Sequence, residues 1–260
     1  MLQHLLRDEA ILGELLKLVH LTQPLTPPLY FADVPVSDDL LVSAAPALTP
    51  PLSDTPTASP WAAVAAALRR RVLDAVFAAL VPLALSERNR ALLLAPELRL
   101  VDALVTALLT PPGSEPLLSA LVLLRALLGD ATARTQLHAA DAAASLLARL
   151  CALLAESSSL QLTSQLLALL EPLLRELRPE SAACAAVLEH GMLPLTALLS
   201  NANVYIVVQT LLALQPLRAL DELRAALRTF IDSDALAALR ASPNDVVRQL
   251  AHELAHALAL

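Results

Sequence analysis

Leucine and alanine recur at helical spacing through most of this chain, and the pattern returns about every 44 residues. Four of the apolar runs end with similar triplets: Val81-Pro82-Leu83, Ala126-Leu127-Leu128, Glu171-Pro172-Leu173 and Gln215-Pro216-Leu217. The middle positions of these triplets are separated by 45, 45 and 44 residues. A unit of this length holds two or three helices and buries its apolar face only against neighbouring units. The pattern therefore predicts an array of stacked helical repeats.

The same spacing predicts five long helices, each opened by a capping signal. Serine or asparagine before an apolar run is such a signal, strengthened by proline at the first helical position. It occurs at Ser59-Pro60, at Ser114 before Pro116, at Ser159, at Asn203 and at Ser242-Pro243. The long helices are expected at about residues 60–82, 115–128, 160–177, 203–217 and 243–259. Shorter pairs are expected between them, at about residues 87–95 with 97–109, 131–139 with 142–156, 179–189 with 192–200, and 219–231 with 233–241.

Composition supports an all-α fold. The chain is 57% hydrophobic but only 2% aromatic, and it holds only 4 glycines in 260 residues. Leucine and alanine are strong helix formers, whereas strand formers are sparse. We expect the longest uncharged run, Gly191 to Leu217, to be two short buried helices divided near residue 200, because Pro194 and a polar cluster interrupt it. The predicted fold class is an all-α, right-handed α-solenoid of repeats.

Three regions follow along the chain. Residues 1–20 have the apolar spacing of an amphipathic helix. Nine of the 19 prolines lie between Leu21 and Pro60, so residues 21–59 are predicted to be an extended or disordered linker. Residues 60–260 form the predicted solenoid of about four to five repeats.

The segment Val187-Leu188-Glu189-His190-Gly191-Met192-Leu193-Pro194-Leu195-Thr196-Ala197-Leu198-Leu199-Ser200-Asn201 resembles the armadillo-repeat pattern. In that pattern a short helix ends in glycine, and a third helix of the form small-apolar-Pro-x-Leu-x-x-Leu-Leu follows. Gly191 is accordingly expected to be a left-handed C-cap that turns the chain. The resemblance to the armadillo and HEAT superfamily covers roughly Ser59 to Leu260.

The resemblance implies a non-enzymatic scaffold or adaptor that binds a peptide or helix of another protein on the concave face. Third helices usually line the concave face, so the polar side chains on that face are the predicted contacts. They are Glu97, Asp102, Arg149, Thr196, Ser200, Asn201 and Arg240. Armadillo proteins that bind nuclear import signals carry a ladder of tryptophan and asparagine. Here the matching positions fall near Leu212 and Pro216, and near Val122 and Ala126. Import-signal binding is therefore not carried over.

Charge and cysteine usage narrow the class of partner and the compartment. The net charge of −7 does not favour nucleic acid, which needs clustered cations. No membrane insertion and no cofactor are expected. Cys151 and Cys184 lie in apolar runs, so we expect buried free thiols and a cytoplasmic protein that can also enter the nucleus.

One motif supports an alternative from another class. His252-Glu253-Leu254-Ala255-His256 matches H-E-x-x-H, in which two histidines one helical turn apart bind zinc and the glutamate acts as general base. A zinc-dependent hydrolase built on these residues is the alternative function. A catalytic zinc needs a third protein ligand, and only four residues follow His256, so Cys184 or His190 would have to supply it. We expect this segment to be a terminal helix of the array without bound metal.

Overall fold

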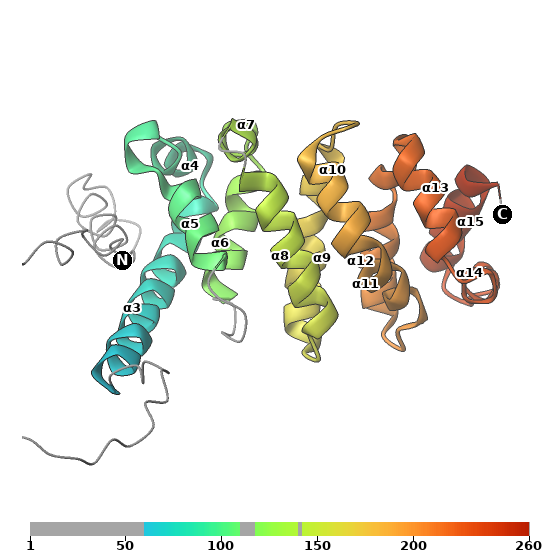
Figure 1. Ribbon diagram of the computed structural model, residues 1–260, viewed down its shortest axis with the longest axis horizontal. Coiled ribbons are helices and arrows are strands. Elements are labelled where there is room, and N and C mark those ends of the chain that lie inside the picture. The colour runs from blue at the N-terminus through green and yellow to red at the C-terminus, as the bar shows by residue number, and fades with distance from the viewer. Residues whose placement is uncertain (1–59, 110–117, 140–141, 260) are drawn as a thin grey trace, which may run out of the picture.

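The computed structural model describes residues 60–109, 118–139 and 142–259, and the predicted N-terminal helix and linker lie outside these ranges. The described chain consists of helices joined by short connections, with no strand among these residues. Its helices stack side by side along one long axis, from α3 at one end to α15 at the other (Figure 1). The all-α solenoid expected from the repeat pattern is confirmed.

Five long helices form one layer of the array. Each packs against the next in the order α3, α6, α9, α12 and α15. Their bounds are α3 Pro60–Ala84, α6 Leu118–Leu128, α9 Leu160–Arg175, α12 Val204–Leu214 and α15 Asp245–Leu258. These bounds agree with the expected long helices within a few residues, although the start of the second one falls in the undescribed residues 110–117.

Shorter helices complete each unit. A first short helix leads into a second, which packs against the long-helix layer. The first helices are α4 Glu87–Leu93, α7 Ala131–Ala139, α10 Ala182–Ala186 and α13 Asp221–Phe230. The second helices are α5 Leu100–Leu108, α8 Ala142–Glu156, α11 Met192–Ala197 and α14 Ser233–Arg240. Short helical turns lie at η2 Pro96–Leu98, η3 Val187–Gly191, η4 Leu198–Ser200 and η5 Pro216–Ala219.

Side-chain caps start α9 and α12 as the sequence predicts, the cap of α15 is shifted, and the predicted caps Ser59 and Ser114 lie outside the described residues. The Ser159 hydroxyl accepts from the backbone N–H of Leu162, and the Asn203 side chain accepts from that of Tyr205. At the last helix, Asn244 is the N-cap instead of Ser242. The expected start at residue 243 is therefore wrong by two residues, because the Asn244 amide oxygen caps two N–H groups of the first turn.

Gly191 does not have the conformation expected of it. Its φ is −97°, on the right-handed side, and the chain continues as one helical rod, Ala182–Ser200, through the π-helical turn η3. The expected left-handed C-cap is wrong, and packing explains the glycine instead. A Cβ at this position would lie 3.1 Å from the Cys151 Sγ and 3.3 Å from Val187 Cγ1. Glycine is needed here so that α8 can approach the rod closely.

The rod Ala182–Ser200 is long and apolar enough, by length and composition, to cross a membrane. In the array, 44% of its most apolar window is buried, and its elements pack against α8 and α13. The expected division of the uncharged run Gly191 to Leu217 is confirmed, because η4 ends at Ser200 and α12 begins at Val204.

A single apolar core runs through the array and consists mostly of leucine. Leu169 of α9 is fully buried, as the repeat phase predicts. The apolar run of α12 predicts that Leu212 is fully buried as well, and this prediction is wrong, because 36% of its surface is exposed. Nearly every residue of α12 is apolar, so its sequence does not show which side faces the stack.

Both cysteines are free and buried, as expected. Burial raises the pKa of the Cys151 thiol to about 12, from an ordinary 9.0. Burial also raises the pKa of the Cys184 thiol, and the Glu222 carboxylate adds to that effect. A raised thiol pKa means that the folded state keeps its proton more tightly. The resulting contribution to stability is present below about pH 9 and is lost as the pH rises toward 12.

We therefore expect Cys151 to resist alkylation in the folded protein. At pH 8 a thiol of pKa about 12 is ionised roughly 1000-fold less than one of pKa 9.0. Iodoacetamide labelling, followed by peptide mass spectrometry, should be at least that much slower than in guanidinium chloride. Labelling of Cys151 at similar rates in both conditions would contradict its burial.

Candidate partner-binding surface

The seven predicted contact residues lie on the second helices of their units and the connections beside them, not on third helices as the prediction requires, because the third helix of each unit is the long one. Glu97, Ser200, Asn201 and Arg240 are exposed. The Asn201 side chain accepts a hydrogen bond from the Asn203 backbone N–H at 2.8 Å, so part of its polar capacity serves the turn before α12. These residues do not form one cluster but recur along the array.

Three of the seven residues have fewer polar atoms free to bind a partner than the sequence indicates. Thr196 is only 7% exposed, and its hydroxyl donates to the Met192 carbonyl at 2.8 Å within its own helix. Asp102 is paired with Arg99 at 3.0 Å. The Nε of Arg149 is buried, with no hydrogen-bond partner among the described residues. Thr196 therefore presents no polar group at the surface, and the remaining set stays a prediction.

A different surface is exposed on the layer of long helices, and α12 lies at its centre. The outward side of α12 carries Tyr205, Val208 and Leu212, followed by Pro216 of η5, at spacings of three and four residues that place them on one helix face. Tyr205 is 54% exposed and Leu212 is 36% exposed. We call Tyr205, Val208, Leu212 and Pro216 the α12 stripe. Tyr205 and Leu212 are its exposed members, whereas Val208 and Pro216 are half-buried, and α12 carries no charged residue.

The apolar surface continues at the N-terminal ends of the neighbouring long helices. Leu160 opens α9, Val204 opens α12 and Val246 lies in the first turn of α15, and each is about half exposed. Side chains in the first turn of a helix have no preceding turn to cover them, which explains their exposure. Apolar side chains therefore extend across three adjacent helices.

Glutamines lie on all three of these helices, and those of α9 and α12 are at equivalent positions. Gln165 is the sixth residue of α9, Gln209 is the sixth residue of α12, and Gln249 is the fifth residue of α15. The Gln165 amide oxygen accepts from Arg125 of α6 at 3.4 Å, and the Gln249 amide donates to Glu253 at 3.0 Å. A glutamine side chain both donates and accepts, so each retains capacity for a partner's backbone. Sequence reasoning missed these glutamines because it looked for tryptophan and asparagine.

The H-E-x-x-H residues lie on the outward side of α15. His252, Glu253 and His256 are all exposed, and the Glu253 carboxylate accepts from Gln249. His190, a candidate third ligand, lies instead in η3 beside Glu189, with 3.8 Å between its Nε2 and the glutamate oxygen. Within the described ranges, no group of three histidine, cysteine or acidic side chains is placed to hold a metal ion.

No protein-family model and no curated protein matches this sequence. Solved structures share its fold. A designed armadillo repeat protein in complex with the peptide (KR)4 is 18% identical, with a TM-score of 0.57, over 72% of this chain and 76% of that one. A computationally designed armadillo repeat protein for modular peptide recognition is 20% identical, with a TM-score of 0.58, over 72% of this chain and 76% of that one.

An engineered protein is also 20% identical, with a TM-score of 0.58, over 73% of this chain and 74% of that one. These likenesses define the class: the chain has the fold of an armadillo repeat solenoid. At this level of identity the likeness concerns the fold alone, so function has to be argued from the surface.

Proposed function

We propose that this protein is a non-enzymatic scaffold that binds a short apolar or amphipathic segment of another protein across the long helices α9, α12 and α15. The observation that carries the proposal is the exposed α12 stripe. Large apolar side chains exposed together on a soluble surface mark interaction sites. A repeat array offers such a surface because each unit adds an equivalent helix beside the last.

The glutamines of α9 and α12 support an extended partner. Packed helices lie about 8–10 Å apart, and an extended chain advances about 3.3 Å per residue. Gln165 and Gln209, at equivalent positions of neighbouring helices, are therefore spaced to meet residues about three apart in an extended segment. Their amides would bind its backbone, while the stripe would bind its apolar side chains.

The charges on this surface favour a partner different from (KR)4, the peptide bound by one structural neighbour. α12 has no charged residue. On α9, Glu171 is already paired with Arg175, and on α15 Asp245 is paired with Arg248. Glu253 of α15 accepts from Gln249 and is the one acidic side chain of these three helices without an ion-pair partner among the described residues, and a single carboxylate does not form an acidic row. The partner in this proposal is a protein segment, not nucleic acid or a lipid bilayer, and its compartment is the cytoplasm or nucleus.

Peptide selection tests the proposal. Peptides selected from a random dodecapeptide library should be apolar or amphipathic, and Leu212→Asp should weaken their binding at least about tenfold, because it places a charge in the contact. Binding should change little at high salt, whereas any binding of (KR)4 should be weak and lost with salt. Fluorescence anisotropy measures both.

Phe230→Asp is the matched control, because Phe230 of α13 is also an exposed apolar residue, at 45%, but lies outside the stripe. Selected peptides that bind Leu212→Asp as well as wild type, or that lose binding equally with Phe230→Asp, would contradict the proposal.

A further inference from the structure

A hollow opens between the second and third units, on the side of the first helices. It has a volume of about 570 Å³ and is bordered by α7, the start of α8, the end of α9 and α10. Many of the side chains that line it are only methyl groups, including Ala131, Ala143 and Ala182. Such small side chains cannot fill the space between two units. Its size is within the range of small-ligand sites, about 300–1,000 Å³.

Helix α10 leaves this space open because its sequence is Ala-Ala-Cys-Ala-Ala. In the two preceding units, an arginine at the fourth position of the first helix reaches back to the end of the long helix. Arg90 donates to the Ala84 carbonyl at 3.5 Å, and Arg134 donates to the Leu128 carbonyl at 2.8 Å. The fourth position of α10 is Ala185, so the third unit has no such side chain.

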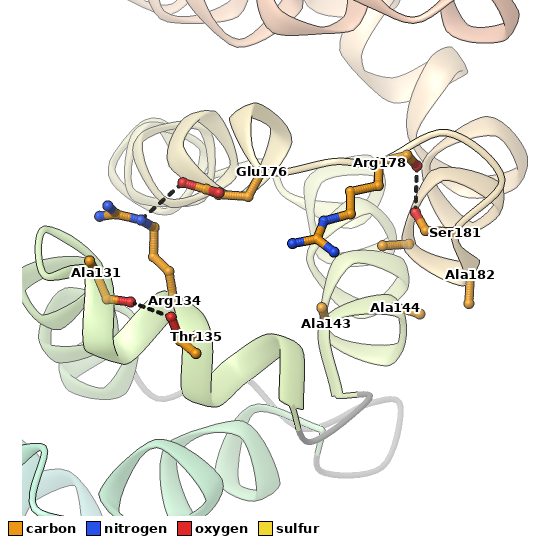
Figure 2. A pocket seen from close by; sticks show the side chains of 10 residues that line it. Ala131, Arg134, Thr135, Ala143, Ala144, Glu176, Arg178, Ser181 and Ala182 are labelled. Atoms are coloured by element: carbon orange, nitrogen blue, oxygen red, sulfur yellow. Dashed lines mark hydrogen bonds and ion pairs between the residues drawn. The ribbon is translucent and has the colours of Figure 1, made fainter.

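Two arginines line the hollow from opposite sides (Figure 2). Arg134 is held in place, because its Nε also pairs with the Glu176 carboxylate at 3.1 Å. The Arg178 guanidinium points into the hollow, and the described residues offer it no hydrogen-bond or ion-pair partner; only its backbone carbonyl is used, accepting from Ser181 at 2.7 Å. With Glu176 neutralised by Arg134, Arg178 leaves an excess positive charge in the hollow.

We propose that this hollow binds an anionic side chain of a partner protein, with Arg178 as its direct contact and the alanine methyls around its apolar stem. A guanidinium binds carboxylate or phosphate through two parallel hydrogen bonds, so a glutamate and a phosphoserine present the same chemistry to it. The site shares no residue with the α12 stripe, and its test does not depend on whether the stripe binds a partner.

Side-chain NMR of the full-length protein tests the site directly. Three capped pentapeptides are titrated: Ala-Ala-X-Ala-Ala, where X is glutamate, phosphoserine or glutamine. The glutamate or the phosphoserine peptide should shift the Arg178 Nε–Hε signal and the Ala182 and Ala183 amide signals in a saturable way. The glutamine peptide should not, and high salt should weaken the response. Tighter binding of glutamate would identify a carboxylate as the natural group, and tighter binding of phosphoserine a phosphate.

Arg178→Gln should abolish the saturable shift, whereas Arg88→Gln, at an exposed arginine of α4, should leave it unchanged. Because Arg178 has no partner, its substitution should not change the thermal midpoint. Three results would overturn the proposal: no saturable shift with either anionic peptide, an equal response to the glutamine peptide, or a response that persists in Arg178→Gln.

Discussion

Truncating Leu169 to alanine should lower the free energy of unfolding by about 2–5 kcal/mol, whereas the same truncation at Leu212 should cost less than about 1 kcal/mol. Leu169 is fully buried in α9, so its loss leaves a cavity between units. Leu212 is 36% exposed, so alanine there removes little buried contact. The two substitutions are chemically identical, and denaturant unfolding measures both. Similar costs at the two positions would contradict the packing of α9 and α12.

The loss at Leu169 should also be local. Stability in a solenoid is largely the sum of units and nearest-neighbour interfaces. Hydrogen exchange in Leu169→Ala should therefore increase first in α9 and its neighbours α6 and α12, and later in α3 and α15. A uniform increase along the whole array would show that the chain unfolds as one cooperative domain.

The second large effect is expected at Gly191. Replacing Gly191 by leucine forces a large side chain against Cys151 and Val187 and should destabilise the protein by about 1–3 kcal/mol or more. Alanine adds only a Cβ, which improves helix propensity by up to about 1 kcal/mol but meets the Cys151 Sγ at 3.1 Å.

A double-mutant cycle separates packing from backbone strain as the reason for the glycine. Gly191→Ala should be destabilising in the wild-type background but neutral or stabilising when Cys151 is also alanine, since the sulfur is then absent. A coupling free energy of about 1 kcal/mol or more supports the close approach of α8. A left-handed glycine would show the same alanine penalty in both backgrounds, and that result would contradict the observed φ.

The helices could be predicted from the sequence because local signals and the repeat agree. Ser159 and Asn203 cap their helices where the apolar runs begin. Gly191 was misassigned because the rule for glycine at helix ends is local, whereas Cys151, whose sulfur determines its role, lies 40 residues earlier in the chain. Tertiary packing overrides a local preference here.

The candidate sites were harder to predict for a related reason. On α12 both faces are apolar, so its exposed stripe can be recognised only once α9 and α15 are in place beside it. The hollow around Arg178 is bordered by residues from 131 to 183, and no short motif connects them. Thr196 is buried and Asp102 is paired with Arg99. The sequence around these two residues does not distinguish them from free surface residues.

Crosslinking tests the proposed binding surface most directly. A selected peptide that carries photoleucine at its apolar positions is bound to the protein, irradiated and mapped by mass spectrometry. We predict crosslinks to residues 204–216 of α12 and η5, and to the outward sides of α9 and α15. Crosslinks confined to the second helices, near Glu97, Ser200 or Arg240, would show that the partner binds the other layer and would contradict the proposal for the α12 stripe.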